Sequence, residues 1–150
     1  MGKNQSNERY GKRARFSQMP DYVENSISFI ELNAPAKELL RRILQQYRGH
    51  NNGDLTAIWN NLKPVLSMKN ERTFIKALNE LIDNELLVFN GLGSTSRKGG
   101  RAPHLYALAW LDVNVIIEGG EKSTNHNRAP PRKHWEQHPA ALDLVNKKIL

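Results

Sequence analysis

The sequence predicts a mainly α-helical domain with one small antiparallel β-hairpin. Three segments repeat their apolar residues at helical spacing, and two later segments have the apolar and aromatic composition of strands. A stretch that contains four glycines joins those two strand-like segments. The chain of 150 residues, 39% hydrophobic and 25% charged, has the length of one domain with polar extensions.

The first helix is predicted by apolar residues at i, i+3, i+4, i+7, i+8 and i+11 between Ala36 and Tyr47. Asn33 is a favourable cap for this helix, and Pro35 is tolerated in its first turn. Gly49 can end the helix because glycine accepts a left-handed backbone. We therefore expect one amphipathic helix that ends close to Gly49.

A second, shorter helix is expected between Leu55 and Leu62, where apolar residues again follow helical spacing. Thr56 is its expected cap. Pro64 should end it, because the proline ring removes an amide donor and clashes with the preceding turn.

The third helix is expected to begin after Asn70, a good N-cap, with Glu71 in its first turn. Its predicted buried stripe consists of Phe74, Ala77, Leu78, Leu81 and Ile82. Its exposed N-terminal half carries Lys69, Arg72, Thr73 and Lys76, whereas its C-terminal half is acidic. A polyanion should therefore meet the N-terminal half, where the bases and the helix dipole both attract it.

The two strands are expected at Leu86 to Phe89 and at His104 to Leu111. The connection between them, 90–103, contains the four glycines, so it predicts a long hairpin with a solvated tip. Three bases and no acid lie in this connection.

The polar segments predict the domain organisation. We expect a flexible basic arm over 1–19, one domain over 20–117 and a linker or disordered segment over 118–139. A short C-terminal helix over 140–150 is expected to be marginal in isolation. For Trp135, inside the expected linker, the sequence leaves two readings open: insertion into a partner's pocket, or simple exposure in the tail.

Several function classes are disfavoured. Cysteine is absent, which excludes disulfides, thiolate metal sites and a cysteine nucleophile. No clustered carboxylate pair and no convincing Ser, His and Asp set is visible, so we expect neither an enzyme nor a cofactor. His134 and His138 are four residues apart, but zinc needs at least one more ligand, so we expect no metal site. The sequence contains no run of 18 apolar residues and no secretory signal. We therefore expect that the protein does not associate with a membrane and that it is cytoplasmic.

The positive charge of the chain is clustered. The net charge is +7 and the pI is near 9.8, and five bases face one acid in the first 18 residues. Clustered bases favour nucleic acid as the partner, and the alternative is a basic surface that serves only solubility.

Three helices followed by a glycine-rich hairpin is the order of elements in a winged helix-turn-helix domain. There the third helix enters the major groove and the hairpin forms the wing, so we predict double-stranded DNA as the partner and a nucleoid-associated protein. Asn79 can approach an adenine if the third helix sits deep in the groove. The predicted DNA-binding residues are Lys69, Asn70, Arg72, Thr73 and Lys76 in the third helix, Arg97, Lys98 and Arg101 in the wing, and Lys12, Arg13 and Arg15 in the arm.

Four short stretches and three single residues carry a resemblance: AKELLRRIL at 36–44, NNGDL at 51–55, ALNEL at 77–81 and LYALAW at 105–110, with Tyr47, Gly49 and Thr73. With these stretches, residues 29–111 resemble helix-turn-helix proteins carried by prophages, plasmids and integrative elements. Where that family has a glycine that closes the recognition helix, this chain has Glu85. We therefore expect Asn84 to adopt the left-handed conformation instead.

The resemblance implies a DNA-binding role, and we expect a transcriptional regulator of a mobile genetic element. Two alternatives stay open. One is a plasmid or phage replication-initiation or maintenance protein whose C-terminal tail recruits a host or replication protein. The other is a phage-encoded protein that inhibits a host nuclease or defence complex. A homodimer is compatible with each, since many helix-turn-helix proteins read two half-sites.

Overall fold

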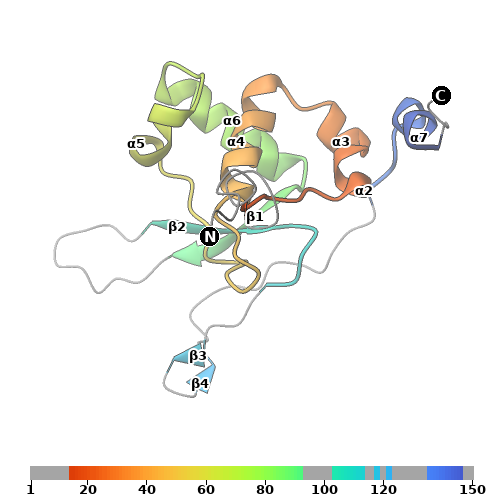
Figure 1. Ribbon diagram of the computed structural model, residues 1–150. Coiled ribbons are helices and arrows are strands. Elements are labelled where there is room, and N and C mark those ends of the chain that lie inside the picture. The colour runs from red at the N-terminus through yellow and green to blue at the C-terminus, as the bar shows by residue number, and fades with distance from the viewer. Residues whose placement is uncertain (1–13, 93–102, 114–116, 119–120, 123–134, 147–150) are drawn as a thin grey trace, which may run out of the picture.

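The computed structural model describes residues 14–92, 103–113, 117–118, 121–122 and 135–146 (Figure 1). The elements, in chain order, are α2 (Asp21–Glu24), α3 (Ile27–Ile30), α4 (Ala34–Leu44), α5 (Trp59–Leu62), the 3-10 turn η1 (Lys63–Val65), α6 (Glu71–Asp83), β1 (Leu87–Leu92), β2 (His104–Leu108), β3 (Ile117–Glu118), β4 (Glu121–Lys122) and α7 (Pro139–Asn146). Helices α4 and α6 pack against each other on one side of the β1–β2 hairpin (Figure 1). The coarse fold class, helices with a small antiparallel hairpin, is therefore confirmed.

The core includes the two helical stripes that the apolar spacing predicts, packed with residues of the hairpin such as Leu87 and Leu108. Helix α4 buries Ala36, Leu39, Leu40, Ile43 and Leu44, and α6 buries Phe74, Ala77 and Leu81. Leu78 and Ile82 pack against this core while partly exposed. Helix α4 ends at Leu44, so Tyr47 lies beyond it, and Gly49 has the expected positive φ of 89°.

The expectation of a helix from Leu55 to Leu62 was wrong in its first half. Leu55 pairs with Tyr106 of β2 through two backbone hydrogen bonds of 3.1 and 2.7 Å. The side-chain amide of Gln46 donates to the Thr56 carbonyl at 2.7 Å and accepts from the Thr56 amide at 2.9 Å. Because these partners hold the backbone extended, Thr56 caps no helix and α5 is a single turn.

The hairpin pairs Leu87 with Leu108 and Phe89 with Tyr106 in antiparallel register. The register shifts between Phe89 and Gly91, and Gly91 has a φ of 115°. Strand β2 ends at Leu108, three residues before the expected end. Asn90, the residue of β1 at this irregularity, is buried, and its Nδ2 donates to the carbonyl of Gly53 at 3.0 Å.

A buried asparagine connects the segment before α5 to the end of β2. Asn52 is fully buried; its Oδ1 accepts from the Leu108 amide at 2.7 Å, and its Nδ2 donates to the Leu108 carbonyl at 3.1 Å. The same Nδ2 lies within hydrogen-bonding distance of the carbonyls of Leu111 and Asp112. One side chain thus satisfies backbone groups that no neighbouring strand reaches.

Part of the expected linker is instead packed on the body of the protein. Trp135 is only 8% exposed, and its ring centroid lies 6.1 Å from that of Tyr22. The backbone around Gln137 pairs with that around Ser26, through Ile27 N to Glu136 O and His138 N to Asn25 O, both 2.8 Å. Both readings of Trp135 were therefore wrong. Its side chain is neither free to enter a partner's pocket nor exposed in a tail, because it is buried against Tyr22 in the same chain.

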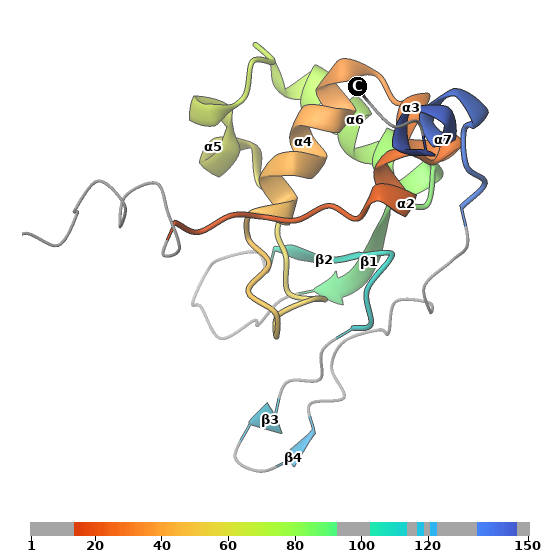
Figure 2. The same ribbon diagram turned by 45° about the vertical axis from the view of Figure 1, so that its right-hand side comes forward.

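Two further elements lie in the C-terminal third. Strands β3 and β4, in and beside the expected linker, form a minimal antiparallel pair. Helix α7 follows the Trp135 segment on the side of α2 and α3, far from α5 (Figures 1 and 2). It occupies part of the stretch for which a short helix was expected.

None of the helices in the described part of the chain is long and apolar enough to cross a membrane.

Candidate nucleic-acid interface

The start of α6 is held by polar contacts from α4. The Glu38 carboxylate accepts hydrogen bonds from the backbone amide and the hydroxyl of Ser67, and Arg42 Nε donates to the Val65 carbonyl at 3.2 Å. Asn70 caps the helix as predicted: its Oδ1 accepts from the Thr73 amide at 2.9 Å and from the Thr73 hydroxyl at 3.0 Å. The connection into α6 is therefore fixed to the helix against which α6 packs.

The outer face of α6 is a single stripe of exposed side chains. Arg72, Ile75, Lys76 and Asn79 are exposed and follow each other at i, i+3, i+4 and i+7, which places them on one side of the helix. Lys69 is exposed just before the helix begins. Phe74, Ala77 and Leu81 face the opposite way, into the core.

The cations of this face are available to an external partner. Within the part of the chain that the structure describes, no hydrogen bond or ion pair engages the side chains of Lys69, Arg72 or Lys76. All three lie near the N-terminal end of α6, where the helix dipole adds positive potential. The exposed acids of α6, Glu71 and Asp83, lie at its two ends.

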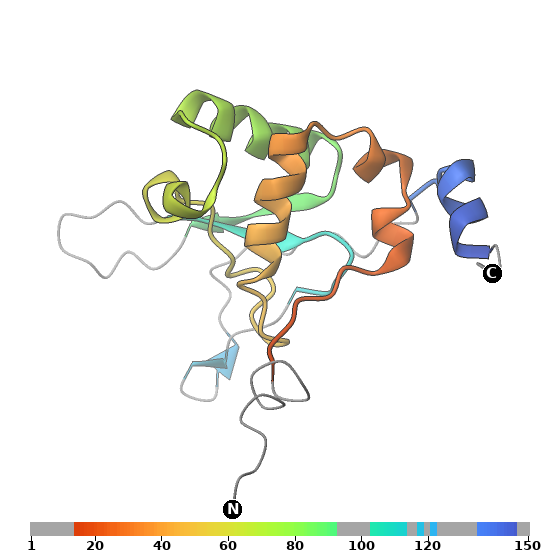
Figure 3. The same cartoon turned by 45° about the horizontal axis from the view of Figure 1, so that its top comes forward.

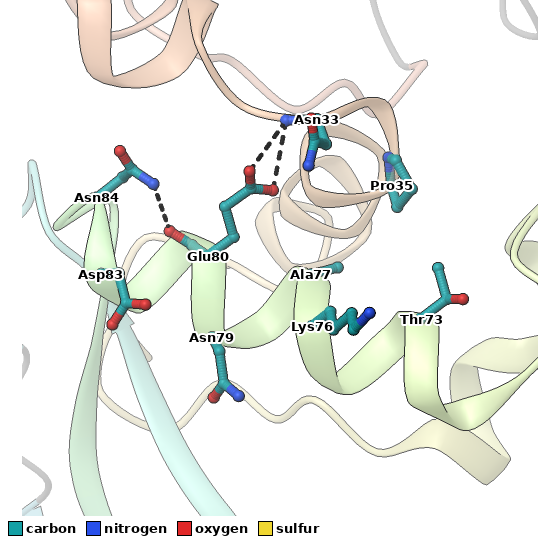
Figure 4. Close-up of a pocket in the computed structure, with 9 residues that line it drawn as sticks. All are labelled: Asn33, Pro35, Thr73, Lys76, Ala77, Asn79, Glu80, Asp83 and Asn84. Carbon is teal, nitrogen blue, oxygen red and sulfur yellow. Dashed lines mark hydrogen bonds between the residues drawn. The ribbon is translucent and has the colours of Figure 1, made fainter.

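A third acid of α6 is turned away from the exposed face. The carboxylate of Glu80 accepts from the backbone nitrogen of Asn33, just before α4 (Figure 4). Asn79 and Asp83 point away from α4 in the same view. The outward stripe between the two ends of α6 is therefore cationic and polar, with one apolar residue.

A shallow hollow of about 360 Å³ lies beside this stripe. Thr73, Lys76 and Asn79 line it from α6, and Asn33 and Pro35 line it from the start of α4 (Figure 4). Glu80 and Asp83 also line it (Figure 4), so two carboxylates stand beside the Lys76 ammonium group and the hollow by itself favours no anionic ligand. No group of three His, Asp or Glu residues that could hold a metal ion occurs among the described residues.

The open end of the β1–β2 hairpin lies on the same side of the molecule as the N-terminal half of α6. The end of β1 and the start of β2, which flank residues 93–102, lie on the side of α5 and of the N-terminal half of α6 (Figures 1 and 3). The predicted wing bases Arg97, Lys98 and Arg101 fall in 93–102, outside the described residues. The described ends of the hairpin thus lie on the same side of the molecule as the N-terminal half of α6 (Figures 1 and 3).

Of the predicted bases of the N-terminal arm, Arg15 is the one that the structure describes, and its side chain bonds the end of α4 and not α6. Lys12 and Arg13 lie outside the described residues. Arg15 Nη2 donates to the carbonyls of Gln45 and Tyr47, just beyond the C-terminal end of α4. Unpaired carbonyls at the end of a helix attract a guanidinium, which explains this position.

The sequence analysis did not single out Ile75. Its side chain is 48% exposed, in the middle of the stripe that Arg72, Lys76 and Asn79 form. The sequence did contain one signal for it, because this apolar residue falls outside the predicted buried stripe of the third helix.

Comparison of the chain with protein-family models, curated proteins and solved structures found no match. The site is therefore interpreted from its own geometry and charge.

Proposed function

We propose that this protein binds double-stranded DNA as a winged-helix domain, with α6 in the major groove and residues 93–102 as a wing on the flanking backbone. The observation that carries the proposal is the exposed face of α6. Lys69, Arg72 and Lys76 have no anionic partner among the described residues; Arg72 and Lys76 lie in the N-terminal half of α6, and Lys69 lies just before it. Unpaired cations that share one surface match the regular phosphates of a duplex.

The arrangement of elements supports the winged-helix assignment. Helix α4, the α5–η1 turn and α6 precede the antiparallel hairpin, and Leu55 pairs with Tyr106 of β2 through an isolated bridge. In such a domain the third helix is the one presented to the major groove.

The dimensions of α6 suit that groove. An α-helix with its side chains is about 10–12 Å wide, and the major groove is about 12 Å wide. From Arg72 to Asn79 the helix rises by about 10 Å, which is the length of about three base pairs. Arg72 can donate to guanine, Asn79 can pair with adenine, and Lys69 and Lys76 can bind phosphates.

The proposal predicts a steep dependence on salt. If Lys69, Arg72, Lys76 and the three wing bases each neutralise one phosphate, the affinity should fall about a thousandfold between 50 and 200 mM salt. Fluorescence anisotropy with a labelled duplex of random sequence measures this dependence. An affinity that does not change with salt, or no binding at low salt, would contradict the proposal.

Matched variants locate the interface. Lys76→Ala should weaken binding to all duplexes and lower the salt slope by about one unit. Arg41→Ala removes the same charge from an exposed position on α4 and should change neither quantity appreciably. Equal losses from both variants would show that net charge matters and that the face of α6 does not.

The proposal also assigns different roles to α6 and the wing. Arg72→Ala should relax the base preference at one position at a cost of about 1–3 kcal/mol, whereas Lys98→Ala should weaken all sequences equally. Parallel binding selections from a random duplex pool measure both effects. Identical base preferences for the two variants would contradict the different roles of α6 and the wing.

We further propose that the protein acts as a transcriptional regulator of a mobile genetic element and carries out no catalysis. A reporter gene placed behind its selected binding site tests this role. Repression or activation that is lost with Arg72→Ala would support it, and occupancy of the site without any change in transcription would contradict it.

The replication or maintenance alternative has one observation in its favour. Helix α7 lies on the side away from α5 and exposes Leu142 and Leu144, which are 39% and 71% exposed. Deletion of 139–150 tests a recruiting role, because it removes α7 and leaves Trp135 in place. A regulator should keep its site binding and its effect on transcription, whereas an initiator should bind its site and fail to start replication.

A further inference from the structure

Ile75 is an apolar side chain in an otherwise polar and charged stripe. It is 48% exposed, whereas its neighbours Phe74 and Ala77 are 3% exposed. Single exposed apolar residues are common on protein surfaces, so exposure alone indicates nothing. The position is informative because the side chain projects from the same face as Arg72 and Asn79.

We propose that Ile75 reads the 5-methyl group of a thymine in the major groove. This inference rests on the proposed DNA-binding function. The thymine methyl is the apolar group on the major-groove edges of the bases, whereas the remaining groups are hydrogen-bond donors and acceptors. An isoleucine between a guanidinium and an amide therefore matches a thymine between polar base contacts.

The spacing along α6 places the three contacts on neighbouring base pairs. Ile75 lies about 4.5 Å along the helix axis from Arg72 and about 6 Å from Asn79. Base pairs are stacked about 3.4 Å apart, so each step corresponds to one or two base pairs. The preferred site should contain a guanine, a thymine and an adenine within about four consecutive base pairs.

The stiffness of isoleucine makes it suitable for this role. An isoleucine side chain in a helix occupies one χ1 rotamer about 90% of the time, so little entropy is lost when a ligand fixes it. The α6 backbone that carries it is anchored by the Asn70 cap and by the contacts of Glu38 and Arg42. The methyl-contacting surface is thus held in place before the DNA arrives.

Substitution of uracil for thymine tests the proposal, since uracil lacks only the 5-methyl group. A bound site is first selected from a random duplex pool, and each thymine in its core is then replaced singly by uracil. The wild-type protein should bind one of these duplexes about threefold to tenfold more weakly, which corresponds to the loss of one buried methyl group. Ile75→Ala should bind the thymine duplex more weakly by a similar factor and should not distinguish it from the uracil duplex.

Val65→Ala is the matched control, because Val65 is also 48% exposed and lies outside α6. This variant should keep the full response to uracil. Circular dichroism should show Ile75→Ala folded as the wild type is, since its side chain lies outside the core.

The outcomes separate this inference from the proposed function. If wild-type protein binds its selected site but no single uracil weakens binding, or if Ile75→Ala still distinguishes thymine from uracil, the role of Ile75 is wrong and DNA binding stands. If no duplex is bound at low salt, both the proposed function and this inference fail.

Discussion

Both carboxylate oxygens of Glu80 lie 3.3 Å from the backbone nitrogen of Asn33, the residue that precedes α4. The contact joins the C-terminal half of α6 to the start of the helix against which it packs. It places a negative charge at the N-terminal end of α4, where the helix dipole favours it. It also keeps that charge off the outward face of α6, where it would repel a polyanion.

Glu80→Ala should lower the free energy of unfolding by about 1 kcal/mol, because the Asn33 amide loses its acceptor and α4 loses a charge that stabilises its start. Urea denaturation monitored by circular dichroism measures the change. Asp83→Ala is the control in the same helix, since Asp83 is exposed near its end, and it should change stability by less than about 0.5 kcal/mol. Equal losses from the two variants would contradict this role for Glu80.

Glu85→Gly should stabilise the protein by roughly 0.5–1 kcal/mol. Glu85 is the one non-glycine residue with positive φ among the described residues, at 61°. Its amide donates to Ile82 O and the Leu86 amide donates to Leu81 O, both at 3.0 Å, which is the Schellman pattern that glycine closes best. Relief of about 1–2 kcal/mol of backbone strain should exceed the entropy that glycine gains in the unfolded chain.

The neighbouring residue provides the control for that prediction. The expectation that Asn84 takes the left-handed conformation was wrong: its φ is −86°, and its Nδ2 donates to the Glu80 carbonyl at 2.8 Å. Asn84→Gly should therefore destabilise the protein. Thermal unfolding of both variants decides the matter, and a gain from Asn84→Gly would overturn the assignment.

Trp135→Ala should lower the free energy of unfolding by about 3 kcal/mol, because it leaves a cavity beside Tyr22 and removes a large buried side chain. Leu144→Ala, at a position 71% exposed on α7, should change it by less than about 0.5 kcal/mol. Chemical denaturation of both variants measures the difference. A small effect at Trp135 would show that residues 135–138 contribute little to the fold.

Stability should decrease at alkaline pH in part because of Tyr106. Burial raises the pKa of its hydroxyl above the ordinary value of 10.0. The unfolded chain then loses this proton near pH 10 while the folded chain retains it, so stability falls as the pH rises above about 10. Tyr106→Phe lacks this contribution and should show a shallower decline between about pH 9 and 11 in urea titrations. Identical slopes for the two proteins would contradict the assignment.

Much of the candidate site could be predicted because it depends on neighbours within one helical turn. Apolar spacing located the buried stripe of α6, and the same geometry places Arg72 and Lys76 on the opposite, exposed side. The Asn70 cap contacts Thr73, three residues away. Ile75 was not among the predicted site residues. An apolar residue outside the buried stripe indicates a binding surface only when the exposed side chains around it are known.

The sequence by itself determined the faces of α4 and α6, the start of α6 and the two strands of the hairpin, since each follows from residues close together in the chain. Only the tertiary structure decided that Leu55 pairs with Tyr106, that Trp135 packs on Tyr22, and that Arg15 binds Gln45, 30 residues away. These contacts join segments whose separation in the chain leaves no periodic pattern. Their free energy comes from burial and from satisfying backbone groups that become neighbours only in the folded protein.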